Sequence, residues 1–428
     1  MEKAILVNLS TNQKEKLEAE ESMNELAGLA LAAGAQVVGK VCQVRSAVSP
    51  KLFIGEGKVE EINRLKDELG AELIIFDHNL RPSQQRGLEN ALQVKVIDRT
   101  QLILDIFAQR AHSNEGKLQV ELAQLSYLLP RLVGKGIALS RLGGSGIGPL
   151  RGPGEKKLEE DRRRIQDRIA KIKHEIRNVQ KRRASQRQSR KESLIPLVSL
   201  VGYTSVGKSS LFNALAQETT FTSSQLFATL DPLVRRAYFS DGLYFFLSDT
   251  VGFIRKLPVE LITSFKATLE EVNESDCIIH VIDLSAPGSE GQAEAVSRIL
   301  SEIGASGIPR LRVYNKIDLL PDKDDLLMRN QQAAADSIYV SAKSGEGLPA
   351  LKTKLRSLLY KDLEMFEMRI PKDRQDILDS LPRWSLVLKK QEKGDYYEMQ
   401  VMANPQRMLD YLPYLEGGEK NCGKKPVF

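Results

Sequence analysis

An eight-residue segment, Gly202–Ser209 (GYTSVGKS), constrains the fold of this chain more than any other feature. It follows an apolar run at 195–201 that we predict to be a strand, and it precedes a helix-like segment at 211–217. Glycines let the backbone N–H groups of such a loop converge on a phosphate, and the N-terminus of the following helix favours negative charge. A chance glycine-rich turn would not need this strand–loop–helix setting. We therefore predict a phosphate-binding loop in which Lys208 contacts the β- and γ-phosphates and Ser209 binds Mg²⁺.

Three later motifs follow further predicted strands and indicate that the nucleotide is GTP. Asp249–Gly252 (DTVG) suits contact with Mg²⁺ through water and with the γ-phosphate. Asn315–Asp318 (NKID) places a carboxylate where it can accept from the N1–H and amine of guanine, a donor pair that adenine lacks. A turn with a helix N-cap is the alternative interpretation of NKID. Ser341–Lys343 (SAK) can give a backbone N–H to guanine O6.

Two residues near these motifs predict a GTP-dependent switch and slow hydrolysis of GTP. Thr229 in Phe227–Asp231 (FATLD) can bind Mg²⁺ only when the γ-phosphate is present, which would make 219–233 a switch ordered by GTP. A surface threonine in a loop is the alternative. Phe253 follows Gly252, where a Ras-type GTPase has a water-orienting glutamine. Phenylalanine cannot orient water, so we assign no catalytic residue and expect hydrolysis to depend on a partner.

The predicted site comprises nucleotide contacts and metal ligands. The predicted GTP-binding residues are Gly202, Tyr203, Thr204, Ser205, Val206, Gly207, Lys208, Ser209, Phe227, Ala228, Thr229, Leu230, Asp231, Asp249, Thr250, Val251, Gly252, Asn315, Lys316, Ile317, Asp318, Ser341, Ala342 and Lys343. The predicted Mg²⁺ ligands are Ser209 and Thr229, with Asp249 acting through a water molecule.

Positive charge is concentrated in one part of the chain. The whole chain has a net charge of +6, but residues 110–191 carry a net charge of +13 and the remainder carries −7. Such asymmetry favours a polyanionic partner. A solvated charged helix is the alternative interpretation.

The same basic segment has the pattern of a helical hairpin. Apolar residues recur at spacings of three and four from Leu118 to Leu132, and again from Leu158 to Val179. We expect Pro130 to kink or end the first helix. Eight glycines lie between 134 and 154. Two apolar stripes with a glycine-rich tip predict an antiparallel hairpin, and a tip of this length favours a functional role.

The pattern along the chain predicts an α/β protein in four parts. Alternating strand-like and helix-like runs indicate an N-terminal α/β domain at 1–108, followed by the basic hairpin and linker at 109–192. A doubly wound, mostly parallel GTPase domain is predicted at 193–362, with a strand at Cys277–Asp283. A small α+β appendage is predicted at 363–428, with strands at Trp384–Leu388 and Tyr396–Met402 and a helix at Pro405–Leu412.

Composition excludes several other classes of protein. No apolar run reaches 18 residues, so we expect no transmembrane helix. The N-terminus is too short and too acidic for a signal peptide. Cys42, Cys277 and Cys422 are too few and too far apart for a disulfide framework or a metal site. We expect a cytoplasmic protein, with a peripheral location at the membrane as the alternative.

Longer strings around the motifs resemble the HflX family of translational GTPases, which bind the large ribosomal subunit and split ribosomes. The resemblance covers about residues 50 to 360. The strings are FIGEGK (53–58), FDHNL (76–80), VIDRT (96–100), LDIFAQRA (104–111), EGKLQVEL (115–122), RGPGE (151–155) and FATLDP (227–232). The resemblance implies an N-terminal HflX domain whose hairpin reaches ribosomal RNA near the peptidyl transferase centre. The predicted RNA-binding residues are Lys135, Arg141, Arg151, Lys156 and Lys157.

Two features depart from the family pattern. Ser205 stands where many members have asparagine, which leaves dependence on potassium open. Gly146–Leu150 precedes RGPGE, and Lys156 and Lys157 follow it where the usual pattern has uncharged polar residues, which predicts a longer and more basic tip.

Three functions of different classes are compatible with these features. We favour a Mg²⁺-dependent GTPase that docks on the large ribosomal subunit and its rRNA, and splits or rescues stalled ribosomes under stress. The second is a nucleotide-gated RNA-binding or ribosome-assembly factor without splitting activity. The third is a regulatory switch whose hairpin binds a protein, which predicts weak dependence on salt. We expect a monomer that does not bind DNA.

Overall fold

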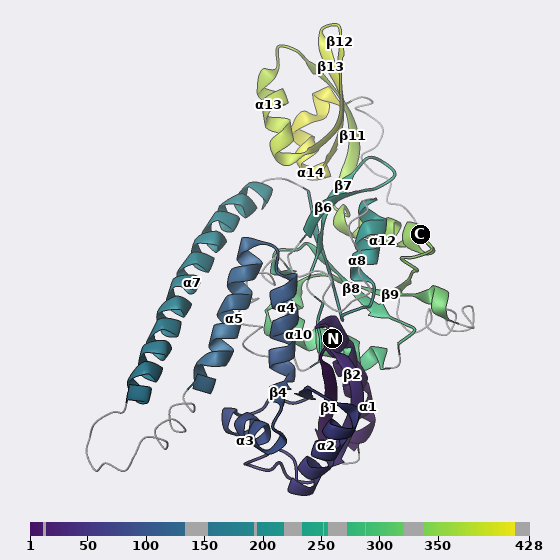
Figure 1. Cartoon of the computed structure of the whole chain (residues 1–428). Coiled ribbons are helices and arrows are strands. Elements are labelled where there is room, and N and C mark those ends of the chain that lie inside the picture. Colours follow the sequence, from purple (N-terminus) through teal and green to yellow (C-terminus); the bar gives the residue numbers. More distant parts are fainter. Residues whose placement is uncertain are drawn as a thin grey trace.

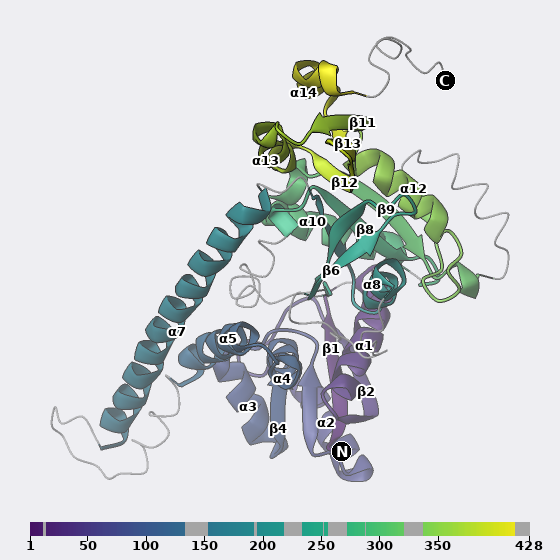
Figure 2. The ribbon, with the colours of Figure 1, turned by 90° about the horizontal axis from the view of Figure 1, so that it is seen from above.

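The computed structural model describes residues 1–11, 14–132, 153–191, 195–217, 233–250, 252–255, 272–286, 288–320 and 337–415. These residues form an N-terminal α/β unit, a helical hairpin, a larger α/β unit and a small C-terminal unit (Figure 1). The hairpin extends to one side of the molecule in both views (Figures 1 and 2). The mixed α/β fold class is confirmed, whereas the predicted domain boundaries stay predictions.

The N-terminal unit is a parallel sheet with helices on both faces. Its strand order is β2-β1-β3-β4, and β1 is buried along almost its whole length. Apolar residues of α1 and α4 pack on one face, and those of α2 and α3 pack on the other. The elements are β1 (Lys3–Ser10), α1 (Lys14–Ala32), β2 (Gln36–Val44), α2 (Glu56–Leu69), β3 (Leu73–Phe76), α3 (Pro82–Leu92), β4 (Lys95–Asp98) and α4 (Arg99–Arg110).

The hairpin consists of α5 (Asn114–Leu132) and α7 (Pro153–Lys191), which lie side by side and antiparallel (Figure 1). Ile172 and Ile176 of α7 pack against Leu122 of α5. The Arg168 guanidinium donates to both carboxylate oxygens of Glu121 at 2.7 Å. The two predicted apolar stripes therefore meet as expected.

Pro130 lies inside the first hairpin helix, and the predicted kink stays a prediction. Helix α5 continues past Pro130 to Leu132, so the proline does not end it. Proline removes one backbone donor, so one intrahelical hydrogen bond is lost at this position. The predicted tip residues Lys135, Arg141 and Arg151 lie outside the described residues.

The larger α/β unit has a six-stranded sheet in the order β10-β9-β8-β5-β7-β6. All neighbouring strands are parallel except β6 and β7, which are antiparallel. Strand β8 is buried at every position, as expected for a central strand covered on both faces. The elements are β5 (Leu197–Gly202), α8 (Lys208–Ala216), β6 (Leu233–Tyr238), β7 (Tyr244–Asp249), β8 (Cys277–Asp283), α10 (Ser289–Glu302), η1 (Ala305–Gly307), β9 (Arg310–Asn315), η2 (Ile317–Leu319), β10 (Ser337–Tyr339) and α12 (Leu348–Leu359).

The C-terminal unit is an antiparallel three-stranded sheet in the order β11-β13-β12, packed with short helices. The strand predicted at Trp384–Leu388 is wrong at its start, because Trp384 ends helix α13 and the strand begins at Leu386. Trp384 instead packs its ring on Tyr411 at 4.9 Å. The elements are β11 (Glu364–Pro371), α13 (Gln375–Trp384), β12 (Leu386–Lys393), β13 (Tyr396–Ala403), α14 (Pro405–Met408) and η3 (Leu409–Tyr414).

Two observations bear on the classes that composition excludes. None of the helices searched within the described ranges has the length and hydropathy needed to cross a membrane. Cys42 is exposed and Cys277 is buried, and both are free thiols. Cys422 lies outside the described residues.

Candidate nucleotide-binding site

The predicted phosphate loop connects β5 to α8, and two of its glycines are required by close backbone contacts. A Cβ atom at Gly202 would lie 2.4 Å from the carbonyl oxygen of Val281 on β8. Gly207 has a φ of +92°, and a Cβ atom there would lie 2.3 Å from Nδ2 of Asn315. Both distances are far below van der Waals contact, so only glycine fits either position. The loop therefore lies directly against β8 and the NKID motif.

Lys208 points into the loop from the first turn of α8. Its side chain is buried, and Nζ donates to the carbonyl oxygens of Gly202 at 3.1 Å and Tyr203 at 2.7 Å. Burial lowers the pKa of Lys208 to about 8, while the nearby Asp249 carboxylate opposes that shift. An ammonium held by neutral carbonyls lacks a counter-charge among these ligands, which makes the loop receptive to an anion.

Ser209 and Asp249 form a pair of oxygen donors beside the loop. Ser209 Oγ donates to Asp249 Oδ2 at 2.9 Å, and Asp249 is almost fully buried at the end of β7. One hydroxyl and one carboxylate fit the hard-oxygen preference of Mg²⁺, which in nucleotide sites takes its remaining ligands from phosphates and water. Among the residues searched, no group of three or more His, Cys, Asp or Glu side chains is placed to hold a metal ion. The third predicted metal residue, Thr229, lies outside the described residues, together with the rest of Phe227–Asp231 and Val251.

The NKID and SAK motifs lie at the carboxyl ends of β9 and β10, where Asn315 contacts the phosphate loop and the SAK segment. Asn315 Nδ2 donates to the carbonyl oxygen of Val206 at 2.8 Å, and Asn315 Oδ1 accepts from the N–H of Ala342 at 2.9 Å. Asp318 Oδ1 accepts from Ser341 Oγ at 2.7 Å. Asn315 therefore ties the phosphate loop to the SAK segment. Their roles in binding GTP stay predictions.

Three other residues of these motifs have side chains that contact other parts of the protein. Lys316 lies within 2.6 Å of the Asp283 carboxylate, and its backbone has a left-handed φ of +66°. Ile317 is buried, and Thr250 Oγ1 donates to the carbonyl oxygen of Leu200 at 2.6 Å. The last two side chains support the backbone around the site.

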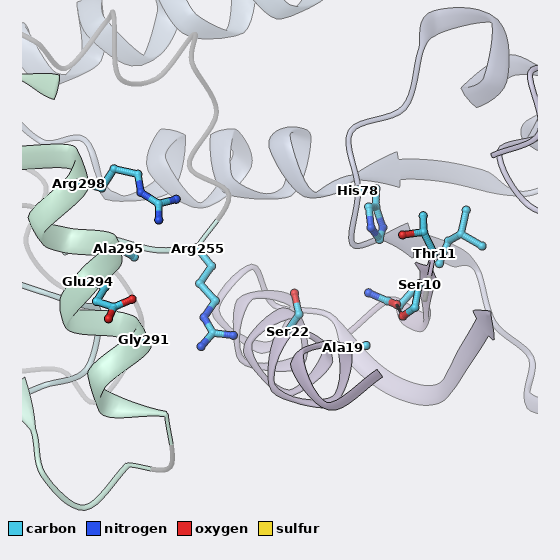
Figure 3. A pocket seen from close by; sticks show the side chains of 12 residues that line it. Ser10, Thr11, Ala19, Ser22, His78, Arg255, Gly291, Glu294, Ala295 and Arg298 are labelled. Atoms are coloured by element: carbon cyan, nitrogen blue, oxygen red, sulfur yellow. Dashed lines mark hydrogen bonds between the residues drawn. The ribbon is translucent and has the colours of Figure 1, made fainter. Parts of the chain in front are cut away.

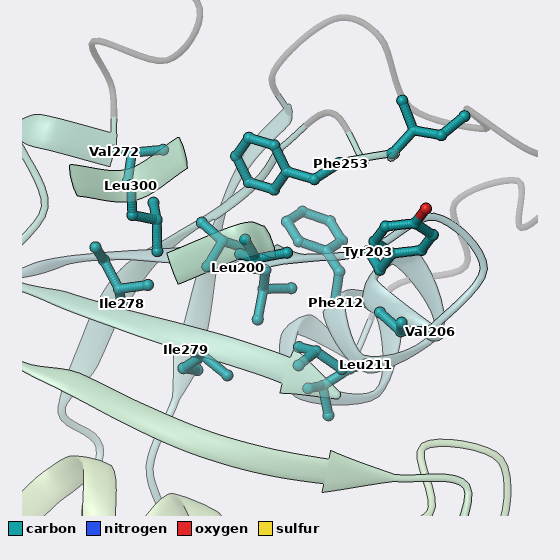
Figure 4. Packing of buried hydrophobic residues seen from close by; sticks show 14 of the residues in the cluster. Leu200, Tyr203, Val206, Leu211, Phe212, Phe253, Val272, Ile278, Ile279 and Leu300 are labelled. Atoms are coloured by element: carbon teal, nitrogen blue, oxygen red, sulfur yellow. The ribbon is translucent and has the colours of Figure 1, made fainter. Parts of the chain in front are cut away.

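Phe253 is tied to the phosphate loop by its backbone. Its N–H donates to the carbonyl oxygen of Gly202 at 3.1 Å, and its own carbonyl oxygen accepts from the N–H of Thr204 at 2.8 Å. Its ring is buried near Tyr203 and Phe212 in the core beneath the loop (Figure 4). The side chain is thus part of the packing, in agreement with its inability to orient water.

Sequence reasoning missed the contacts that join this site to the N-terminal unit. Tyr203 Oη donates to Glu25 of α1 and accepts from the N–H of Arg255 at 2.6 Å. Arg99, at the start of α4, donates to the carbonyl oxygen of Arg255 at 3.2 Å. No local pattern around Glu25 or Arg99 reveals these contacts, because Tyr203 and Arg255 lie more than 150 residues away in the sequence.

A cavity of about 690 Å³ lies between the same two units. Ser10, Thr11 and His78 line it from the carboxyl ends of β1 and β3, and Arg255 and Arg298 line it from the other side (Figure 3). It belongs to neither unit alone, so sequence motifs within one unit could not predict it.

Three family models match the chain in consecutive segments. The N-terminal region of the GTP-binding GTPases matches residues 20–108, and their middle region matches residues 110–190. The model described as 50S ribosome-binding GTPase matches residues 197–316. GTPase HflX from Caldanaerobacter subterraneus subsp. tengcongensis is 45% identical over 410 residues, which cover 95% of this chain and 93% of that protein. The chain belongs to the GTPase HflX family.

A second curated HflX relative agrees with this assignment, and one solved structure is similar to the chain. GTPase HflX from Escherichia coli K12 is 44% identical over 370 residues, 86% of each chain. A GTP-binding protein from the archaeon Sulfolobus solfataricus, solved in complex with GDP, is 27% identical, with a TM-score of 0.43 and coverage of 84% of this chain and 99% of that one. In this HflX-family chain, the middle-region match coincides with the basic hairpin, and the 50S ribosome-binding match contains the phosphate loop, DTVG and the start of NKID.

Proposed function

We propose that this HflX-family chain binds GTP with Mg²⁺, docks on the large ribosomal subunit in the GTP-bound state, and splits or rescues stalled ribosomes under stress. Hydrolysis of GTP then releases it. The observation that carries the proposal is the convergence of the phosphate loop, DTVG, NKID and SAK at one edge of the six-stranded sheet. These segments span more than 140 residues of sequence.

Different described side chains at this site serve phosphate binding, metal binding and base recognition. The loop backbone and Lys208 would bind the phosphates, while Ser209, and Asp249 through water, would hold Mg²⁺. When bound, Mg²⁺ neutralises charge on the β- and γ-phosphates. Asp318 reads guanine, while Asn315 keeps the base-reading and phosphate-binding segments in register.

Two findings support a ribosomal partner. The matched family model is described as a 50S ribosome-binding GTPase. The hairpin region carries a net charge of +13, which suits a phosphate-rich surface such as rRNA. We propose that Lys135, Arg141, Arg151, Lys156 and Lys157 contact this RNA, and that the protein acts in the cytoplasm.

Because the site has Phe253 in place of a water-orienting residue, we expect the ribosome to complete the site for hydrolysis as well as to bind the protein. A buried phenylalanine cannot position the attacking water. We therefore expect purified large subunits to raise GTP turnover at least tenfold, with Lys208→Ala as a control that cannot hold the phosphates. Equal turnover with and without subunits contradicts a site completed by the ribosome.

Splitting is tested separately, by sedimentation of intact ribosomes mixed with the protein and GTP. Appearance of free subunits with the natural chain, and their absence with Lys208→Ala, supports splitting. Nucleotide-dependent binding without separation favours the RNA-binding or assembly factor.

A further inference from the structure

Glu25 on α1 is held in place by a buried charge network of the N-terminal unit. Arg99 is fully buried, and its guanidinium donates to Asp77 Oδ1 at 2.7 Å and to Glu25 Oε1. Asp77 Oδ2 accepts from Asn8 Nδ2 at 2.9 Å and from Ser22 Oγ at 2.7 Å. A buried ion pair with these additional hydrogen bonds has one favoured geometry. The position of the Glu25 carboxylate is therefore set by the N-terminal sheet.

The same carboxylate contacts the phosphate loop through Tyr203. Burial, reinforced by the Glu25 charge, raises the pKa of the Tyr203 phenol, so the hydroxyl keeps its proton and donates it to Glu25. The phenol oxygen accepts in turn from the N–H of Arg255, and Arg99 donates to the carbonyl oxygen of Arg255. Both backbone groups of Arg255 are thus held by the network.

This arrangement keeps residues 252–255 close against the phosphate loop. Phe253 exchanges two backbone hydrogen bonds with Gly202 and Thr204. A Cβ atom at Gly252 would lie only 3.0 Å from Lys208 Nζ and 2.8 Å from Thr204 Cγ2. Lys208 Nζ itself is directed at two loop carbonyls.

A γ-phosphate would contact the same lysine and the same backbone segment. One of its oxygens would have to lie between Lys208 Nζ and the N–H of Gly252, at about 2.8–3.0 Å from each nitrogen. A movement of residues 252–255 away from the loop to admit that oxygen would strain or break their contacts with Tyr203 and Arg99. A diphosphate has no γ-phosphate and makes no such demand.

We propose that Glu25 is a positioning residue that holds residues 252–255 against the phosphate loop through Tyr203, and thereby disfavours guanosine triphosphate relative to the diphosphate. The inference rests on the GTP binding of the proposed function and assigns its regulation to the N-terminal unit. Coupling between two sites is reciprocal, so triphosphate binding equally weakens the contact between Glu25 and the loop.

The test is the selectivity of the full chain for two nucleotides. Dissociation constants for GDP and for the non-hydrolysable analogue 5′-guanylyl imidodiphosphate are measured with Mg²⁺ by calorimetry. Glu25→Ala is expected to shift the ratio of the two constants about tenfold towards the analogue, which corresponds to about 1.4 kcal/mol. Glu20→Ala, the same change at an exposed position of α1, is expected to leave the ratio unchanged.

Tyr203→Phe tests whether the effect passes through the phenol. It removes the hydroxyl and keeps the buried ring, so the fold is retained. It is expected to shift the ratio in the same direction, and Glu25→Ala is expected to add little in its presence. Full additivity of the two changes, or equal shifts in both constants, overturns the proposal.

The outcomes separate this inference from the proposed function. Binding of both nucleotides with an unchanged ratio in correctly folded Glu25→Ala overturns the positioning role alone. A natural chain that binds neither nucleotide overturns the GTP site and the positioning role together.

Discussion

At the scale of single residues, Gly207 and Asn315 depend on each other. The positive φ of Gly207 turns the chain into α8, and the missing side chain leaves room for the Asn315 amide. That amide then bridges Val206 and Ala342. One glycine thus allows two distant motifs to share a hydrogen-bonded contact.

Gly207→Ala is expected to lower GTP affinity at least tenfold, because the methyl group displaces Asn315 and distorts the loop. Gly242→Ala is the matched control, since Gly242 has a similar φ of +86° but open space around it. Both changes cost about 1–2 kcal/mol of backbone strain. Fluorescent-nucleotide titration and thermal unfolding separate the two effects, and equal affinity losses would refute the role of Asn315.

At the scale of elements, β8 carries a buried histidine in the centre of the sheet. Burial, with Arg310, Arg312 and Lys208 as nearby positive charges, lowers the pKa of His280 to about 3. His280 Nδ1 is buried and has no hydrogen-bond partner within the described ranges. The folded protein therefore keeps this imidazole neutral.

Acidification is expected to destabilise the fold through His280. Below pH 6.5 an unfolded histidine gains a proton that the folded one does not, so stability falls from pH 6.5 towards pH 3. The loss between pH 6.5 and 4.5 is about 2–3 kcal/mol. Urea unfolding at several pH values is expected to show a shallower slope for His280→Leu, and an identical slope would contradict this assignment.

At the scale of the whole molecule, positive charge and nucleotide chemistry are separated. The hairpin carries the basic surplus and extends to one side, while the nucleotide site lies in the six-stranded unit (Figure 1). A change in hairpin charge can therefore alter docking without touching the phosphate loop.

Neutralising Arg141, Arg151, Lys156 and Lys157 together is expected to weaken binding to large subunits and to flatten its dependence on salt, with GTP affinity unchanged. Each lost phosphate contact reduces the slope of log affinity against log salt by about 0.7–0.9. The control neutralises four exposed basic residues elsewhere, Lys361, Lys389, Lys393 and Arg407. Equal losses in the two variants, or a joint loss of GTP affinity, would argue against a separate docking element.

Much of the fold was predictable where the pattern was local and strong. The predicted and observed bounds of β8 agree, because a continuous apolar run suits a strand covered on both faces. Helix α4, strand β11 and helix α13 were not predicted. Both β11 and α13 nevertheless have local patterns. In β11, Phe366, Met368 and Ile370 alternate with charged residues, and in α13 the buried residues Ile377, Leu378 and Leu381 share one helix face, so these two elements were overlooked rather than unmarked in the sequence.

The nucleotide motifs were determined by the sequence alone, because phosphate loops and base-reading turns need particular residues within a few consecutive positions. Tertiary structure alone decided how the N-terminal unit meets this site. Glu25 and Tyr203 are 178 residues apart, and their contact exists only because the packing of the two α/β units places α1 beside the phosphate loop. Buried charges such as Arg99 acquire their partners only when the fold excludes water from them.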